Sequence, residues 1–181
     1  MNWHLYYKII TGIGGRYLVL AFIATVLFYV VYKQKWQFKK IQQAFPKSKD
    51  YVREIGYSLL TISIFGFIVY TLLFYTPVAK HTFRYNDINT YGWAWYFTAF
   101  LIMLVVHDTY FYWVHRIMHH PKLFKLFHVV HHKSTNPSPW AAYAFQPAEA
   151  VVEAGILPIF VFTLPLHISH TFIFFFFMIV I

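Results

Sequence analysis

Long stretches without a charged side chain constrain this chain more than any other feature of its sequence. Apolar runs that carry almost no charge cover residues 15–32, 55–76, 91–113 and 154–181. At about 1.5 Å per helical residue, such runs match the thickness of a lipid bilayer. Hydrophobic types make up 59% of the 181 residues and charged types only 12%, so a soluble domain would lack the interior to bury them. The sequence predicts an all-α, polytopic membrane helical bundle of about four spans, forming a single domain over residues 1–181.

The basic residues predict the orientation of these spans. The loop between the second and third runs carries two of them, Lys80 and Arg84. The loop between the first two runs carries seven, namely Lys33, Lys35, Lys39, Lys40, Lys47, Lys49 and Arg53. Because loops rich in Lys and Arg stay in the cytoplasm, the third run should return to the cytoplasmic side at His107. We therefore expect an integral, multi-pass membrane protein with a cytoplasmic, histidine-rich helical region at 107–149. Cations placed beside apolar runs, rather than along a polar face, also argue against nucleic-acid binding.

Histidines are concentrated just after the third run. Seven of the eleven lie between His107 and His132. Two spacings stand out, H-x-x-x-H and H-x-x-H-H, and their members are His115, His119, His128, His131 and His132. Because each helical residue advances by about 100°, the members of each set share one helix face. Two such faces turned toward each other would place five imidazoles around one pocket.

Two further side chains share the face of the first set. Asp108 and Tyr112 lie within the same arc of a helix as His115 and His119. A carboxylate there could accept a hydrogen bond from a ring N–H and fix the tautomer of a ligating histidine. We therefore expect Asp108 and Tyr112 to support the histidines from behind, while His107 and His120 point away from this face.

The chemistry of such a pocket is limited by the residues that are missing from the sequence. The chain has no cysteine, which excludes thiolate metal sites and cysteine-held iron–sulfur clusters. Neutral imidazole suits iron, zinc, copper and nickel. The H-E-x-x-H motif of zinc peptidases is absent because Arg116 follows His115. More than four histidine ligands point to two metal ions, and two irons can activate O₂ for attack on an unactivated C–H bond.

The same residues resemble a known family. The pattern D-x-x-F-Y-W-x-H-R-x-x-H at 108–119 resembles the first histidine box of the sterol desaturase and fatty acid hydroxylase superfamily, and 128–132 resembles the second. The sequences N-P-S-P-W-A-A at 136–142 and Q-P-A-E at 146–149 are similar to those of bacterial members.

The resemblance implies a non-haem di-iron oxidoreductase that hydroxylates or desaturates a sterol, fatty acid or related lipid. It implies two Fe ions, O₂ and an external electron donor, such as a cytochrome b5-like protein or a ferredoxin with its reductase. It also implies a metal-ligand role for the boxed histidines, His115, His119, His128, His131 and His132.

The sequence departs from the family pattern in two places. Many members have histidine where this chain has Gln146. The family also carries a third box, another H-x-x-H-H, further downstream, and His167 and His170 do not have that spacing. We therefore expect the chain to correspond to the first two-thirds of such an enzyme and to hold an incomplete set of ligands.

Three other readings stay open at this point. A non-catalytic metal-binding membrane protein, or a pseudoenzyme lacking the third box, would carry the same two boxes. A bis-histidine haem protein would need pairs facing each other across spans, which adjacent pairs such as His131 and His132 fit poorly. A basic, histidine-rich surface that binds anionic headgroups predicts scattered histidines rather than two boxes in helical phase.

Overall fold

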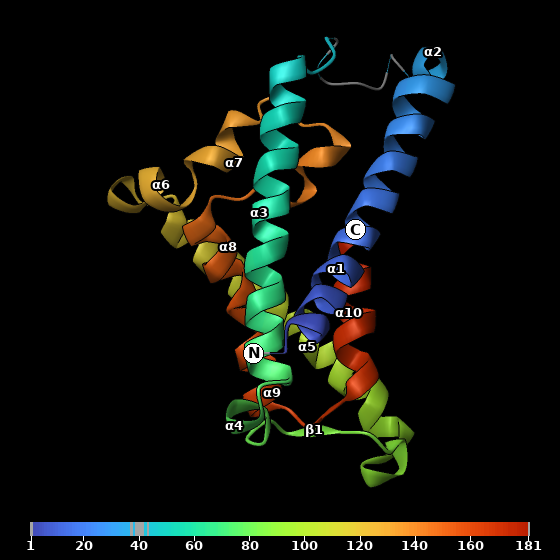
Figure 1. Ribbon diagram of the computed structural model, residues 1–181, viewed down its shortest axis with the longest axis vertical. Helices are drawn as coiled ribbons and strands as arrows, with labels where there is room; N and C mark the ends of the chain where they lie inside the picture. Colours follow the sequence, from blue (N-terminus) through green and yellow to red (C-terminus); the bar gives the residue numbers. More distant parts are fainter. Residues whose placement is uncertain (1, 37, 39–41, 43, 181) are drawn as a thin grey trace.

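Three long helices form the frame of the molecule (Figure 1). The computed structural model describes residues 2–36, 38, 42 and 44–180. Helix α1 (Trp3–Thr25) continues through a π-helical stretch at Val26–Val31, and α3 (Ser48–Leu73) and α5 (Gly92–Met118) are the other two. Within the described residues, these three helices are long and apolar enough to cross a membrane. The expected all-α membrane bundle is therefore confirmed.

Shorter elements connect and cover the long helices. They are α2 (Lys33–Trp36), α4 (Thr76–Ala79), β1 (Arg84–Tyr85), a 3₁₀ turn (Ile88–Thr90), α6 (Pro121–Phe127), α7 (Val129–Lys133), a second 3₁₀ turn (Pro139–Tyr143), α8 (Pro147–Ala154), α9 (Ile156–Thr163), β2 (Leu166–His167) and α10 (Ile168–Val180). The two strands are short and pair in parallel, with Arg84 opposite Leu166 and Tyr85 opposite His167.

The first and third helices are longer than the apolar runs that predicted them. The first begins at Trp3 rather than near residue 15, because the side chain of Asn2 accepts a hydrogen bond from the backbone N–H of Leu5 and caps the first turn. The third runs on to Met118, past the expected end at 113. His115 therefore sits on the last turn of a continuous membrane helix.

The fourth apolar run, 154–181, does not form one continuous span. Helix α9 ends at Thr163, and α10 begins only at Ile168. Between them Leu164 is extended, with φ −119° and ψ 133°, as expected for a residue that precedes a proline. Pro165 cannot continue the hydrogen-bond ladder of α9, and the chain instead forms the strand β2 beside β1. Where about four spans are expected, the described residues thus form three long apolar helices and the two shorter helices α9 and α10, and Ile181 lies outside the described residues.

Helices α1 and α3 pack closely because a glycine lies at their contact. A Cβ atom added at Gly66 would overlap Cγ2 of Ile10 and come within 3.6 Å of the ring of Tyr6. Small residues at helix contacts of this kind let two membrane helices approach closely.

A second set of contacts joins α5 to the two short apolar helices. Its buried side chains are Ala99, Met103, Ile156, Phe160, Leu166 and Phe174. The opposite face of α5 is apolar yet exposed, as at Leu101 and Val105. An apolar surface of this extent on a membrane helix is suited to contact with lipid.

Polar contacts fasten the loop that follows α7 to the first two long helices. The hydroxyl of Tyr17 on α1 and that of Ser58 on α3 both donate to the carbonyl oxygen of Trp140, at 2.8 and 3.0 Å. The fully buried carboxylate of Glu54 on α3 accepts from the hydroxyl of Ser138 at 2.5 Å. These bonds hold the loop against α1 and α3 at the same time.

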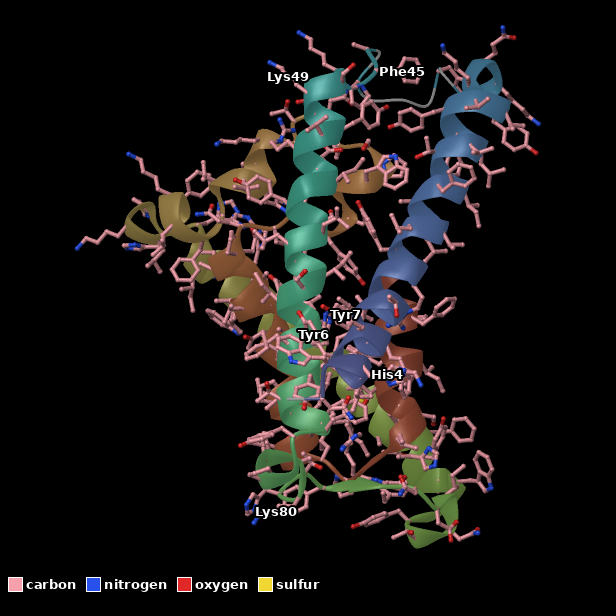
Figure 2. All side chains as sticks on the ribbon, in the orientation of Figure 1. His4, Tyr6, Tyr7, Phe45, Lys49 and Lys80 are labelled. Carbon is pink, nitrogen blue, oxygen red and sulfur yellow. The ribbon has the colours of Figure 1, made fainter. Side chains whose placement is uncertain are left out.

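The histidine-rich region lies at the same end of the bundle as Lys49 and Arg53, the basic residues at the start of α3. Figure 2 labels Lys49 near one end of the molecule and Lys80 near the other. The guanidinium of Arg53 donates to the hydroxyl of Ser134, and the side-chain amide of Asn136 donates to the carbonyl of Ala44. Lys39 and Lys40 of the expected basic loop lie outside the described residues.

Candidate metal centre

The first pair of histidines lies at the end of α5. His115 occupies its last turn, and His119 is the C-cap residue, whose backbone N–H donates to the carbonyl of His115. Their Nε2 atoms are 3.1 Å apart. The helix therefore carries both rings to one point on the face that turns toward α6 and α7.

The second group follows directly in the chain. His128 separates α6 from α7 and has a non-helical backbone, with φ −132° and ψ −3°. His131 and His132 lie on α7. The Nε2 atom of His132 lies 3.4 Å from Nε2 of His119, and the ring of His128 lies 4.5 Å from that of His115, centroid to centroid. The two histidine groups meet in one cluster.

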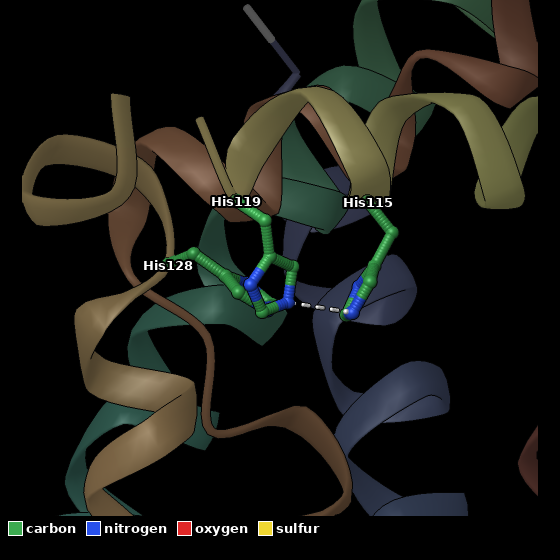
Figure 3. A group of neighbouring side chains, drawn as sticks. All are labelled: His115, His119 and His128. Carbon is green, nitrogen blue, oxygen red and sulfur yellow. Dashed lines mark hydrogen bonds between the residues drawn. The ribbon is translucent and has the colours of Figure 1, made fainter. Parts of the chain in front are cut away.

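Three of the rings point at a common centre. His115, His119 and His128 approach each other from α5 and from the α6–α7 junction, as Figure 3 shows. One ring nitrogen from each of them lies within 4.8 Å of the others. The rings of His131 and His132 flank His128, at 4.8 and 4.9 Å between centroids.

Burial keeps the central histidine neutral. His128 is fully buried, and its Nδ1 lies 2.6 Å from Oε1 of Glu149, which is also buried. Loss of solvation, followed by repulsion from neighbouring histidines, lowers the pKa of His128 to about 3. Loss of solvation is also the main cause of a lowered pKa at His131. Neutral imidazole is the form that binds a metal ion.

The donor set fits a metal ion held by imidazole. Nε2 of His128 is buried and has no hydrogen-bond partner within the described part of the chain. A buried polar atom without a partner is costly, and this one lies close to ring nitrogens of His115 and His119, an arrangement that a metal ion would satisfy. Metal-bound histidines commonly bond a carboxylate through the other ring nitrogen, as His128 does with Glu149.

Asp108 and Tyr112, which are expected to support the histidines, line a recess with His115 but bond to other residues. The carboxylate of Asp108 is 82% exposed and lies 3.2 Å from Nδ1 of His107, not from a boxed histidine. The hydroxyl of Tyr112 accepts a hydrogen bond from Arg116 at 2.9 Å. An open recess of about 310 Å³ is lined by Asp108, Phe111, Tyr112, His115 and Arg116.

The carboxyl group that contacts a boxed histidine is that of Glu149, which helix phase did not indicate. Its signal in the sequence is the Q-P-A-E segment, in which Gln146 and Glu149 form the capping box of α8. Gln146 also binds the end of α6, because its side-chain amide donates to the carbonyls of Lys125 and Leu126. The residue at this family position thus joins α8 to the histidine region without being a histidine.

The remaining histidines near the boxes have other contacts. The ring of His107 stacks on that of Phe111, at 6.0 Å between centroids. His120 is the N-cap residue of α6, where its Nδ1 accepts from the backbone N–H of Lys122.

The two histidines of the last apolar run belong to a separate cluster around β2. His170 is buried, its Nδ1 accepts from the backbone N–H of His167, and its Nε2 donates to the carbonyl of Tyr96. Both ring nitrogens of His167 also have partners, Ser169 and the carbonyl of Asn86. Satisfied ring nitrogens indicate a structural role for this pair.

Comparison with known proteins matches the histidine region to a described family. A family model for fatty acid hydroxylase matches residues 100–181. A delta(7)-sterol 5(6)-desaturase of Gibberella zeae is 36% identical over 125 residues, which are 68% of this chain and 38% of that protein. Lathosterol oxidase of Rattus norvegicus is 29% identical over 165 residues, 88% of this chain and 52% of the relative.

A third relative shows the same partial coverage. A delta(7)-sterol 5(6)-desaturase of Aspergillus fumigatus is 29% identical over 146 residues, 81% of this chain and 44% of that protein. The chain thus spans about half the length, or less, of these relatives. No solved structure matches.

Proposed function

Because this chain belongs to the sterol desaturase and fatty acid hydroxylase superfamily, a family of oxidoreductases, we propose that it supplies two histidine boxes of an iron-dependent, O₂-using lipid enzyme. The observation that carries the proposal is the cluster of boxed histidines, in which His115, His119 and His128 turn ring nitrogens toward one point. Bound iron would supply the O₂ chemistry that attack on an unactivated C–H bond requires.

The proposed ligands are the five boxed histidines, His115, His119, His128, His131 and His132. In this arrangement His128 is the buried ligand, whereas His119, His131 and His132 lie at the surface of the described chain. The protein's part is to keep these rings neutral and oriented, and to exclude water on the His128 side. An all-imidazole donor set supports iron over magnesium or calcium, which prefer oxygen ligands.

The proposed substrate is a membrane lipid that is hydroxylated or desaturated. The named relatives act on delta(7)-sterols or lathosterol, so a sterol is the first substrate to test. Electrons would come from an external donor, a cytochrome b5-like protein or a ferredoxin with its reductase.

The test compares His128→Ala with His120→Ala in the complete gene product. His120 is the matched control because it belongs to the same segment but caps α6 instead of joining the cluster. We expect iron to co-purify with the unaltered protein and with His120→Ala, and to be lost from His128→Ala together with O₂-dependent oxidation of lipid. Equal iron content in all three would refute the site. Iron without lipid oxidation would favour the non-catalytic metal-binding alternative, and a Soret band in the absorption spectrum would favour haem.

We also propose that the histidine boxes face the cytoplasm. The proposal rests on the basic residues near Lys49, which lie at the same end of the molecule as the boxes, whereas Lys80 lies at the other end. Ends that are rich in Lys and Arg tend to remain in the cytoplasm. The chain has no cysteine, so a single one can report its own side of the membrane. A membrane-impermeant maleimide added to intact cells should label Lys80→Cys and spare Lys125→Cys. The reverse pattern would overturn the orientation.

A further inference from the structure

One carboxylate faces two of the boxed histidines. The rings of His128 and His131 are stacked, with centroids 4.8 Å apart and planes 12° from parallel. Oε1 of Glu149 lies 2.6 Å from Nδ1 of His128 and 3.9 Å from Nδ1 of His131. Both rings therefore turn the same edge toward Glu149. Because Nδ1 and Nε2 lie on different sides of an imidazole, both Nε2 atoms turn away from the carboxylate.

The carboxylate is itself held in place. Its second oxygen, Oε2, accepts a hydrogen bond from the backbone N–H of Gln146 at 3.2 Å, which closes the capping box of α8. Glu149 is 1% exposed, and the next residue, Ala150, is fully buried. A side chain fixed by the start of a packed helix loses little further freedom when it binds a ring N–H.

We propose that Glu149 is the positioning residue shared by His128 and His131, and that it fixes both rings with Nδ1–H toward the carboxylate and Nε2 toward the metal position. The inference rests on the proposed metal site and deepens it. Its strongest support is Nε2 of His128, which is buried without a partner in the described chain while Nδ1 has one. Such a carboxylate behind a ligand also increases the basicity of the imidazole.

This assignment gives the Q-P-A-E segment a second use. The N3 glutamate of a capping box ordinarily bonds only the backbone of its own helix. Here Oε2 of Glu149 accepts from the backbone of its own helix, whereas Oε1 bonds His128 and lies 3.9 Å from Nδ1 of His131. In this way the start of α8 sets the orientation of two rings from another segment, one at the α6–α7 junction and one on α7.

The test measures zinc affinity of the chain in lipid nanodiscs by competition with a chelator. Zn²⁺ is the probe because it binds imidazole and is diamagnetic. Glu149→Leu removes the acceptor, Glu149→Gln keeps an oxygen that can accept from Nδ1–H, and Glu153→Leu is the control one turn further along α8. We expect Glu149→Leu to bind Zn²⁺ about 10–100-fold more weakly, which is the usual cost of losing such a partner. Glu149→Gln should recover most of that loss, and Glu153→Leu should match the unaltered chain.

A spectroscopic measurement separates positioning from a merely structural role. In the zinc-loaded unaltered chain with ¹⁵N-labelled histidine, we expect His128 and His131 to carry their proton on Nδ1. Protons on Nε2 of these two rings, or zinc affinity of Glu149→Leu within about twofold of the unaltered chain, would overturn the proposal. If Glu149→Leu does not fold, the proposal is tested by the zinc affinity of Glu149→Gln and by the position of the ring protons in the labelled unaltered chain. Failure of the unaltered chain to bind Zn²⁺ would instead count against the proposed metal site.

Discussion

The close contact between α1 and α3 can be tested at a single glycine. In Gly66→Ala, the new methyl group would overlap Cγ2 of Ile10 and lie 3.5 Å from its Cβ. Because Cγ2 is attached directly to Cβ, it moves only if the stiff χ1 angle of isoleucine changes or if the helices separate. Crowding of this kind costs about 1–3 kcal/mol.

Gly56, also on α3, provides a control that separates the cost of crowding from the change in helix propensity. A Cβ added at Gly56 would meet no atom within 4 Å. Both replacements gain the helix propensity of alanine, about 1 kcal/mol, so this gain cancels between the two variants. We therefore expect Gly66→Ala to be less stable than Gly56→Ala by about 1–3 kcal/mol.

Unfolding in mixed micelles of increasing SDS content, followed by circular dichroism, measures the difference. Adding Ile10→Ala to Gly66→Ala should restore most of the loss, because the overlapping methyl group is removed, and a coupling energy of at least about 1 kcal/mol is expected for residues in direct contact. Equal stability of the two single glycine variants would show that α1 and α3 do not approach each other at this point.

Three further changes test other parts of the structure. Burial raises the pKa of Glu153 to about 7, so its charge destabilises the folded state increasingly as pH rises from about 4.5 to 7. Glu153→Gln should therefore raise the melting temperature at pH 8, with a gain in folding free energy of at most about 3 kcal/mol. At pH 4 the same replacement should have little effect, and an equal effect at both pH values would contradict this explanation. Phe160→Ala should cost about 3–5 kcal/mol in SDS unfolding because its ring is buried against Phe174, whereas the exposed Phe176→Ala should cost little. Ser138→Ala removes a donor from a buried carboxylate and should cost about 1–3 kcal/mol in the same assay, and an unchanged midpoint would refute that role.

The sequence was informative where a pattern is local. Charge-free runs predicted the long helices, because crossing a bilayer requires a continuous apolar surface. Histidine spacing predicted which rings share a face, and the structure brings His115 and His119 to one point and places the second box against them. The break at Leu164 and Pro165 also has a local cause, because a proline cannot continue the helix that precedes it.

The sequence was less informative where a contact joins distant segments. Helix phase placed Asp108 on the face of His115, but phase does not say what covers that face, and the carboxylate is exposed beside His107. The carboxyl group that contacts a boxed histidine is that of Glu149 on α8, which lies 21 residues after His128 in the chain. Such a partner follows from the way α6, α7 and α8 fold back on each other, which no periodicity within one helix encodes.

The loop after α7 is bonded to two membrane helices at once, through Tyr17 on α1 and Ser58 on α3. In a bilayer that is too thin or too thick, helices relieve the mismatch by tilting. A change of tilt between α1 and α3 would pull on the carbonyl of Trp140, which both hydroxyls share, and so on the segment that continues into α8. We therefore expect the thickness of the surrounding membrane to affect the histidine cluster, so that metal affinity differs between nanodiscs of short-chain and long-chain lipids.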